Sequence, residues 1–90
     1  MDSPSWTLKW NPKAERQVSQ LEKSAALRVL KKVRWLSQSP NPPRLLKPLR
    51  ENRSGQYSLR IQEYRAILEV IEEEHILLVI EVGHRRDIYS

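Results

Sequence analysis

The sequence predicts an α+β domain in which an amino-terminal strand and two helices are followed by an antiparallel meander of three strands. Three observations support this prediction. Apolar residues recur at helical spacing over residues 14–36, they alternate with polar residues after Gly55, and a proline-rich segment (40–43) separates the two patterns. The two helices should pack on one face of the antiparallel sheet and leave its other face partly open. Ninety residues suit one domain, which we assign to residues 1–90.

The amino-terminal segment predicts a strand that leads directly into the first helix. Apolar and polar side chains alternate from Trp6 to Trp10, which places Trp6, Leu8 and Trp10 on a buried face. Asn11 and Pro12 are typical of a helix N-cap and a first helical position. The inner face of this helix is predicted to hold Ala14, Val18 and Leu21.

A second helix is predicted to begin at Ser24, which can serve as its N-cap. Its inner stripe is predicted to consist of Ala26, Leu30, Val33 and Leu36. Trp35 is expected to pack against the core, like the other two tryptophans. The opposite side of the helix carries the basic residues Arg28, Lys31, Lys32 and Arg34. The simplest interpretation of this basic run is a solvated helix face.

The second half of the chain predicts three strands. The first buries Tyr57, Leu59 and Ile61, which alternate with Ser58, Arg60 and Gln62. The second runs from about Tyr64 to Ile71 and buries Tyr64, Ala66, Leu68 and Val70. The nearly continuous apolar run from Ile76 to Val82 is typical of a central strand buried on both sides, and Gly83 is expected to end it.

Composition excludes several kinds of site. The chain has no cysteine, so it has neither disulfides nor thiolate zinc ligands. His75 and His84 are nine residues apart with no carboxylate arranged around both, so we expect no metal and no other cofactor. No stretch approaches the roughly 20 apolar residues of a membrane span. The amino terminus lacks the features of a secretory signal, so we expect a cytoplasmic protein.

The charge balance favours a polyanionic partner. Lysine and arginine number 16 against 11 acidic residues, which gives a formal net charge of +5. Such an excess suits nucleic acid, the ribosome or an acidic protein segment. A protein that is merely basic remains the alternative at this level.

The open face of the predicted sheet gathers arginines. Arg60 and Arg65 both point away from the buried sets of their strands, and a tight turn near Gln62 joins these strands, so the two arginines should be neighbours. Arg85 and Tyr89 follow the last strand at the end where they would approach Arg65. Like charges facing each other across a sheet are unfavourable, and a bound phosphate would relieve the repulsion. The alternative is that Arg60 and Arg65 form ion pairs with Glu63, Glu69 or Glu81.

Such a site suits the cleavage of RNA without a metal. The 2′-OH of RNA attacks the neighbouring phosphate once a base removes its proton, and arginines can stabilise the resulting charge. Tyr89 or His84 could take that proton. The sequence contains no paired carboxylates or Ser/His/Asp arrangement that would favour glycoside or acyl chemistry.

Four segments in order resemble the RelE/ParE toxins. They are Leu46–Leu49, Gly55–Ile61, Glu63–Ile67 and Val82–Tyr89, which hold a lysine-leucine element, a Gly-x-Tyr-x-Leu-Arg strand, a Tyr-Arg strand and a Gly-His-Arg-Arg tail ending in tyrosine. The resemblance covers nearly the whole chain. It implies the RelE-like fold, a metal-independent endoribonuclease that cuts mRNA in the ribosomal A site, and a cognate RelB-like antitoxin.

The resemblance also implies roles for individual residues. Arg65 and Arg85 match the catalytic arginines, with Arg85 also a candidate leaving-group acid, and Tyr89 matches the carboxy-terminal tyrosine. Arg60 lies where a catalytic basic residue is common, and His84 where the family often has Lys or His. RNA or ribosome contacts fall to Lys47, Arg50, Arg53 and Arg86. The chain departs from the family pattern at Ser58, where members can carry lysine, and in ending one residue after Tyr89.

Two other functions compete with the ribonuclease. A ParE-like toxin would inhibit DNA gyrase on the same fold without cutting RNA. A corepressor would bind operator DNA as a complex with its antitoxin, assisted by Arg28, Lys31 and Lys32 of the basic helix. Because Arg60, Arg65, Arg85 and Tyr89 occur together, the ribonuclease is favoured. The antitoxin is expected to lay an acidic or amphipathic helix over the basic surface or the two helices.

Overall fold

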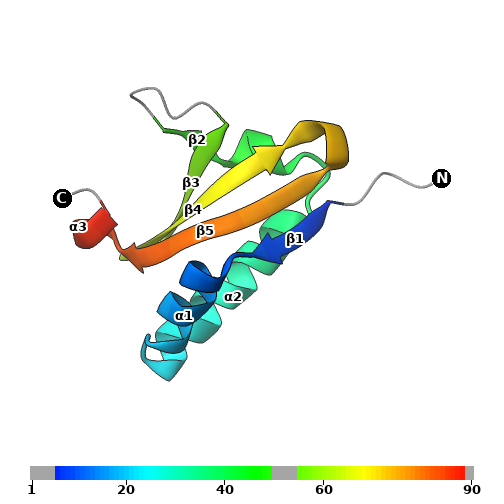
Figure 1. Cartoon of the computed structure of the whole chain (residues 1–90). Helices are drawn as coiled ribbons and strands as arrows, with labels where there is room; N and C mark the ends of the chain where they lie inside the picture. The colour runs from blue at the N-terminus through cyan, green and yellow to red at the C-terminus, as the bar shows by residue number, and fades with distance from the viewer. Residues whose placement is uncertain (1–5, 50–54, 89–90) are drawn as a thin grey trace.

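The computed structural model describes residues 6–49 and 55–88, and within them it contains a five-stranded sheet with helices on one face (Figure 1). In chain order the elements are β1 (Thr7–Trp10), α1 (Pro12–Ser19), α2 (Lys23–Ser37), a 3₁₀ helix (Pro42–Leu45), β2 (Lys47–Pro48), β3 (Gln56–Ile61), β4 (Tyr64–Ile71), a second 3₁₀ helix (Glu72–Glu74), β5 (Ile76–His84) and α3 (Arg85–Ile88). The predicted α+β class is therefore confirmed.

The sheet has the strand order β1-β5-β4-β3-β2. Strands β3, β4 and β5 form the predicted antiparallel meander, and β5 is an interior strand between β1 and β4. The predicted burial of β5 on both sides is wrong, because only Leu77, Val79 and Val82 on its core face are buried. The sheet as a whole is mixed and not purely antiparallel, because β1 pairs parallel to β5, with Leu8 opposite Leu77. The helices carry the chain over one face and leave β1 beside the last strand, a contact between distant segments that no local pattern specifies.

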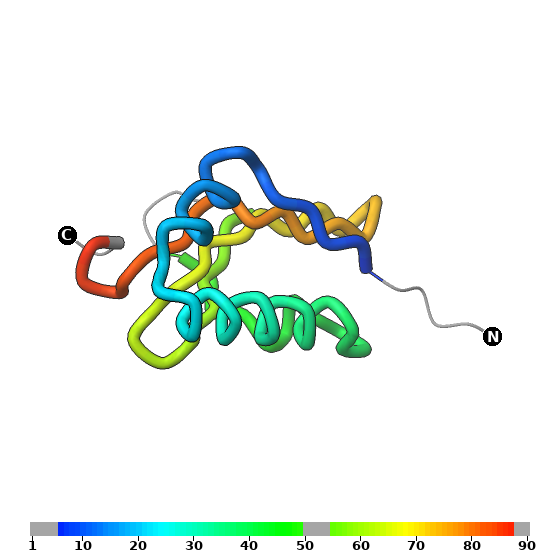
Figure 2. The backbone as a smooth tube through the Cα atoms, turned by 90° about the horizontal axis from the view of Figure 1, so that it is seen from below, coloured from blue at the N-terminus to red at the C-terminus, as the bar shows by residue number. Residues whose placement is uncertain are grey.

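The hydrophobic core lies between α1, α2 and the sheet, and Figure 2 shows α2 running along that face. Its largest completely buried side chains include Val29, Val33, Leu36, Leu68 and Leu77. The apolar residues predicted for the first strand, Trp6, Leu8 and Trp10, pack against this cluster as expected.

The start of α1 follows its predicted chemistry. Asn11 Oδ1 accepts a hydrogen bond from the Ala14 N–H at 2.8 Å, and Pro12 occupies the first turn. Further along α1, the Gln17 side chain accepts a hydrogen bond from the Val82 N–H at 2.7 Å. This bond satisfies the edge of β5 beyond the point where β1 ends, and it ties α1 to the strand.

The second helix differs from its prediction in three ways. It begins at Lys23, so Ser24 lies inside the first turn, where its helical backbone cannot serve as an N-cap. Leu30 is 42% exposed, because the buried stripe is built from Ala25, Val29, Val33 and Leu36. Trp35 is 48% exposed and so is not a core residue. None of the helices in the described ranges is long and apolar enough to cross a membrane.

The sheet also differs from its prediction. The short edge strand β2 was not expected, because two residues carry no alternation. Gly83 does not end β5, which continues to His84 with Gly83 paired to Arg65. On the face that we expected to be partly open, the register pair Ser58 and Ile67 is buried, whereas Arg60 is exposed.

Candidate functional site

A polar hollow of about 600 Å³ lies where β5 meets α3. We call it the α3 hollow, and its lining residues are Glu63, Arg65, His84, Arg85 and Arg86. They come from the β3–β4 turn, β4, the end of β5 and the first turn of α3. The Arg85 N–H donates to the Glu63 carbonyl oxygen at 2.8 Å, which fastens the start of α3 to the β3–β4 turn.

Arg65 is held in the wall of this hollow. Its side chain is half-buried, its Nε is shielded from solvent, and its Nη1 donates a long hydrogen bond of 3.4 Å to Ser58 Oγ. Ser58 is itself only 3% exposed, so its hydroxyl is a fixed acceptor. Gly83, which has no side chain, lies directly opposite Arg65 on β5. This combination places one guanidinium in a restrained position beside open space.

Arg60 lies directly opposite Arg65 in the β3–β4 register, as the turn predicted. It does not line the α3 hollow, however. Its Nε donates to the Gln62 carbonyl oxygen at 3.3 Å, and Arg60 is one of the residues that line a second hollow, beside α2. The two arginines are therefore neighbours on one sheet, but they line different hollows.

His84 is positioned on three sides. Its Nε2 lies 3.8 Å from Glu63 Oε1, its ring meets Tyr64 edge-on with centroids 5.6 Å apart, and its Nδ1 accepts a hydrogen bond from the Arg86 N–H at 3.2 Å. An accepting Nδ1 carries no proton, so the proton is on Nε2 and points toward the carboxylate. In this arrangement both ring nitrogens face groups of the protein itself.

The structure brings together four of the residues predicted for the site, namely Arg65, His84, Arg85 and Arg86. Lys47 is exposed on β2 and lines neither hollow. Arg50, Arg53 and Tyr89 lie outside the described residues. No three His, Cys, Asp or Glu residues of the described ranges are grouped to hold a metal ion.

Two residues of the site were missed as functional candidates in the sequence. Glu63 was considered only as an ion-pair partner of the arginines, whereas its carboxylate faces His84. Ser58 was considered only as a departure from a family pattern, whereas its hydroxyl holds Arg65. The alternation of side chains along β3 could have identified Ser58, because it places Ser58 on the same strand face as Arg60.

The chemistry of the α3 hollow suits a phosphate. Three guanidinium groups can approach one anion, and guanidinium binds phosphate oxygens through paired N–H donors. The alternative, that Arg60 and Arg65 form ion pairs with nearby glutamates, is weakened in two respects. Glu81 Oε2 lies 3.8 Å from Lys13 Nζ and so pairs with a lysine, and Arg60 has no ion pair among residues 6–49 and 55–88.

Comparison with known proteins identifies similar sequences. A family model described as ParE toxin of type II toxin–antitoxin system, parDE, matches residues 8–89. Toxin RelG of Mycobacterium tuberculosis is 37% identical over 51 residues, which cover 57% of this chain. That match spans 59% of the length of the curated relative.

Solved structures with similar folds extend over more of the chain. A chain of the RelBE2 toxin–antitoxin complex from Mycobacterium tuberculosis superposes with a TM-score of 0.81 at 26% identity, covering 93% of this chain and 95% of that one. The isolated Escherichia coli RelE toxin gives a TM-score of 0.73 at 23% identity, covering 96% and 93%. The archaeal RelE–RelB complex of Pyrococcus horikoshii gives 0.71 at 19% identity, covering 91% and 97%. For the Escherichia coli and Pyrococcus horikoshii proteins, whose identities are this low, the similarity shows a shared fold alone.

Proposed function

Because this chain belongs to the RelE/ParE superfamily of toxins of type II toxin–antitoxin systems, we propose that it is a metal-independent endoribonuclease that cuts ribosome-bound mRNA in the A site. The observation that carries this proposal is the gathering of Arg65, Arg85, Arg86 and His84 around one hollow. Such a cluster can hold a backbone phosphate and stabilise the charge that develops on it during cleavage.

The proposed reaction needs no cofactor. The 2′-oxygen of the substrate attacks the adjacent phosphorus, the bond from phosphorus to the 5′-oxygen breaks, and a 2′,3′-cyclic phosphate and a 5′-hydroxyl result. Arg65 stabilises the equatorial oxygens of the pentacoordinate phosphate. Arg85, on the exposed first turn of α3, donates the proton that converts the leaving 5′-oxygen into a hydroxyl. Arg86 is placed to contact the backbone of the bound strand.

The remaining residues support this chemistry. Because His84 Nδ1 is engaged by the Arg86 N–H, we assign the 2′ proton to Tyr89 and keep His84, steered by Glu63, as the second candidate. Arg60 orients the phosphate from the neighbouring strand. Lys47, Arg50 and Arg53 remain proposed contacts of the RNA or the ribosome.

We also propose that a RelB-like antitoxin neutralises this toxin in the cytoplasm. RelE chains similar in fold to this one were solved together with RelB antitoxins from Escherichia coli and Pyrococcus horikoshii. An acidic or amphipathic helix laid over the basic surface would block the approach to RNA. Operator DNA is the third proposed partner, bound through the complex of toxin and antitoxin.

The second candidate is inhibition of DNA gyrase. It is favoured by the family model that matches residues 8–89, which is named for the ParE toxins. The ribonuclease is the better supported of the two, because gyrase inhibition without RNA cleavage gives the arginines of the α3 hollow no reacting phosphate.

One experiment separates the two functions. Purified toxin is added to an in vitro translation reaction with labelled mRNA, with and without ribosomes, and transcript ends are mapped by primer extension. In parallel, the toxin is added to a gyrase supercoiling assay. We expect cuts that require ribosomes and leave cyclic phosphate ends, with supercoiling unaffected. Intact mRNA together with inhibited supercoiling would transfer the assignment to the gyrase inhibitor.

Ser58 provides a milder test of the site. Replacing Ser58 by alanine removes the acceptor of the Arg65 hydrogen bond, so we expect cleavage to slow roughly two- to tenfold, as for the loss of about 0.5–1.5 kcal/mol. Single-turnover cleavage on programmed ribosomes measures the effect. The Ser58→Thr protein keeps a hydroxyl, so we expect it to cleave faster than the Ser58→Ala protein. Ser19→Ala, at an exposed position of α1, serves as the control. Equal rates for the Ser58→Ala and Ser19→Ala proteins would show that the hydroxyl does not position Arg65.

A further inference from the structure

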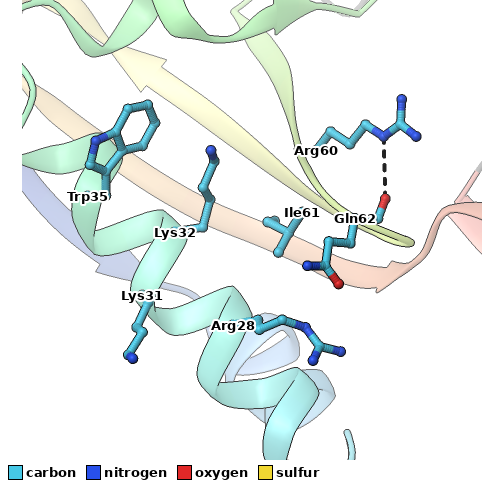
Figure 3. A pocket seen from close by; sticks show the side chains of 7 residues that line it. All are labelled: Arg28, Lys31, Lys32, Trp35, Arg60, Ile61 and Gln62. Carbon is cyan, nitrogen blue, oxygen red and sulfur yellow. Dashed lines mark hydrogen bonds between the residues drawn. The ribbon is translucent and has the colours of Figure 1, made fainter.

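A second hollow of about 420 Å³ lies between α2 and the β3–β4 turn (Figure 3). We call it the α2 hollow. Four cationic residues line it, Arg28, Lys31 and Lys32 from α2 and Arg60 from β3, and none of the described residues that line it is acidic. Lys31 and Arg60 direct their charged ends away from the hollow (Figure 3). Gln62, at the turn, lies between the two elements. This hollow is distinct from the α3 hollow, and among the described residues the two share none of their lining.

Trp35 gives the α2 hollow an aromatic surface. Almost half of this side chain is exposed, although a tryptophan placed for packing alone is expected to be buried. The Lys32 ammonium lies 4.4 Å from the centroid of the ring, so a cation sits over its face. Ile61 adds a second apolar group to the lining. Cations beside an exposed aromatic ring are the combination that binds single-stranded nucleic acid, through phosphates and stacked bases.

The α2 hollow and the α3 hollow meet at one pair of residues. Arg60 lines the first, Arg65 lines the second, and the two face each other directly across β3 and β4. Side chains in such a cross-strand pair have Cβ atoms only about 5 Å apart. A strand bound with its scissile phosphate at Arg65 can pass Arg60 and round the β3–β4 turn to reach the α2 hollow.

We propose that the α2 hollow is a second RNA subsite, in which Trp35 stacks on an unpaired base flanking the cleaved phosphate while Arg28 and Lys32 bind the backbone. This inference rests on the proposed RNA-cleaving function and extends it to a recognition site away from the reacting atoms. In this proposal the residues around α3 cleave the RNA, and the residues of α2 bind the RNA beside the cleaved phosphate.

The observations favour single-stranded RNA over other macromolecules. An amphipathic helix of a protein partner would seek the exposed apolar residues Leu27 and Leu30 of α2, and neither lines this hollow. A DNA duplex presents phosphates but keeps its bases stacked on one another, so it would leave the exposed face of Trp35 unused.

Binding to the free toxin tests the aromatic part. The probe is a short fluorescein-labelled RNA whose 2′-hydroxyls are replaced by 2′-O-methyl groups, so that it cannot be cleaved, and its anisotropy is followed at low salt. We expect Trp35→Leu to weaken binding on the order of tenfold, and Trp35→Phe, which keeps a ring for stacking, to retain most of it. Circular dichroism melts verify that each variant is folded.

Matched charge variants test the cationic part. The Arg28→Ala/Lys32→Ala protein loses two cations of the α2 hollow, and Lys23→Ala/Arg34→Ala loses two exposed cations of the same helix that do not line it. With about 0.7 released counterions per phosphate contact on single strands, the first variant should lower the slope of log K against log salt by roughly 1.4. The second should leave the slope near that of the wild type.

Each unexpected outcome has a definite meaning. Equal weakening by both double variants, or no effect of Trp35→Leu, overturns the subsite. A DNA duplex of equal length that binds as tightly as the RNA, independently of Trp35, would identify a duplex-binding surface instead. An acidic peptide that competes with the RNA only when Trp35 is present would identify a protein-binding site. The cleavage reaction on ribosomes is assayed separately, so an active enzyme with an idle α2 hollow refutes this inference and leaves the proposed function standing.

Discussion

Replacing Arg85 by alanine is expected to slow ribosome-dependent cleavage of mRNA by a factor of about 10²–10³, as does the loss of other groups that stabilise transition-state charge. Arg85 begins α3 and is exposed, but its backbone N–H is fastened to the Glu63 carbonyl oxygen at 2.8 Å. The substitution keeps this backbone bond and removes only the guanidinium. The rate of the first turnover on ribosomes programmed with labelled mRNA measures the effect.

The same loss is expected for Arg65→Ala, whose guanidinium is held by Ser58 in the wall of the α3 hollow. Arg16→Ala provides the matched control, because it removes the same charge from an exposed position of α1 that lines neither hollow. If the variants at Arg65 and Arg85 cut mRNA as fast as the Arg16 variant, the α3 hollow is not the site of the reaction. A loss confined to one of the two arginines would assign the charge stabilisation to that residue alone.

Replacing Leu77 by alanine is expected to lower the free energy of unfolding by about 2–5 kcal/mol. Leu77 is completely buried in β5, where it faces Leu8 of β1 on one side and Val70 of β4 on the other. Truncation leaves a cavity between three strands that cannot all move inward. The free energy of unfolding of a small domain is only about 5–15 kcal/mol. The melting temperature of the Leu77→Ala protein should therefore lie roughly 10–30 °C below that of the wild type.

The control for this prediction is Leu27→Ala on α2. Leu27 is 49% exposed, so its truncation makes no cavity and should change stability by no more than about 0.5 kcal/mol. Urea denaturation followed by circular dichroism compares the two variants. Similar midpoints would mean that the contact between β1, β4 and β5 contributes little to the stability of the fold.

The sequence predicted part of the candidate site because the evidence was local. A two-residue turn joins β3 and β4, so the facing of Arg60 and Arg65 follows from the length of that turn. The separation of these arginines into two hollows does not follow from it. That separation depends on how α2 lies against β3, and on the Gln62 carbonyl oxygen that draws the Arg60 side chain aside. The position of His84 likewise depends on Glu63, which the turn brings beside the end of β5.

The sequence by itself determined the features that depend on neighbours within a few residues. The Asn11 cap on the Ala14 N–H, the end of α2 before the prolines and the alternation along β3 and β4 are all of this kind. Only the tertiary structure decided the parallel pairing of β1 with β5 and the choice of Val29 over Leu30 for the core. Both alternatives satisfy the same helical or strand period. The outcome is set by apolar area buried between segments far apart in the chain, which a local pattern does not contain.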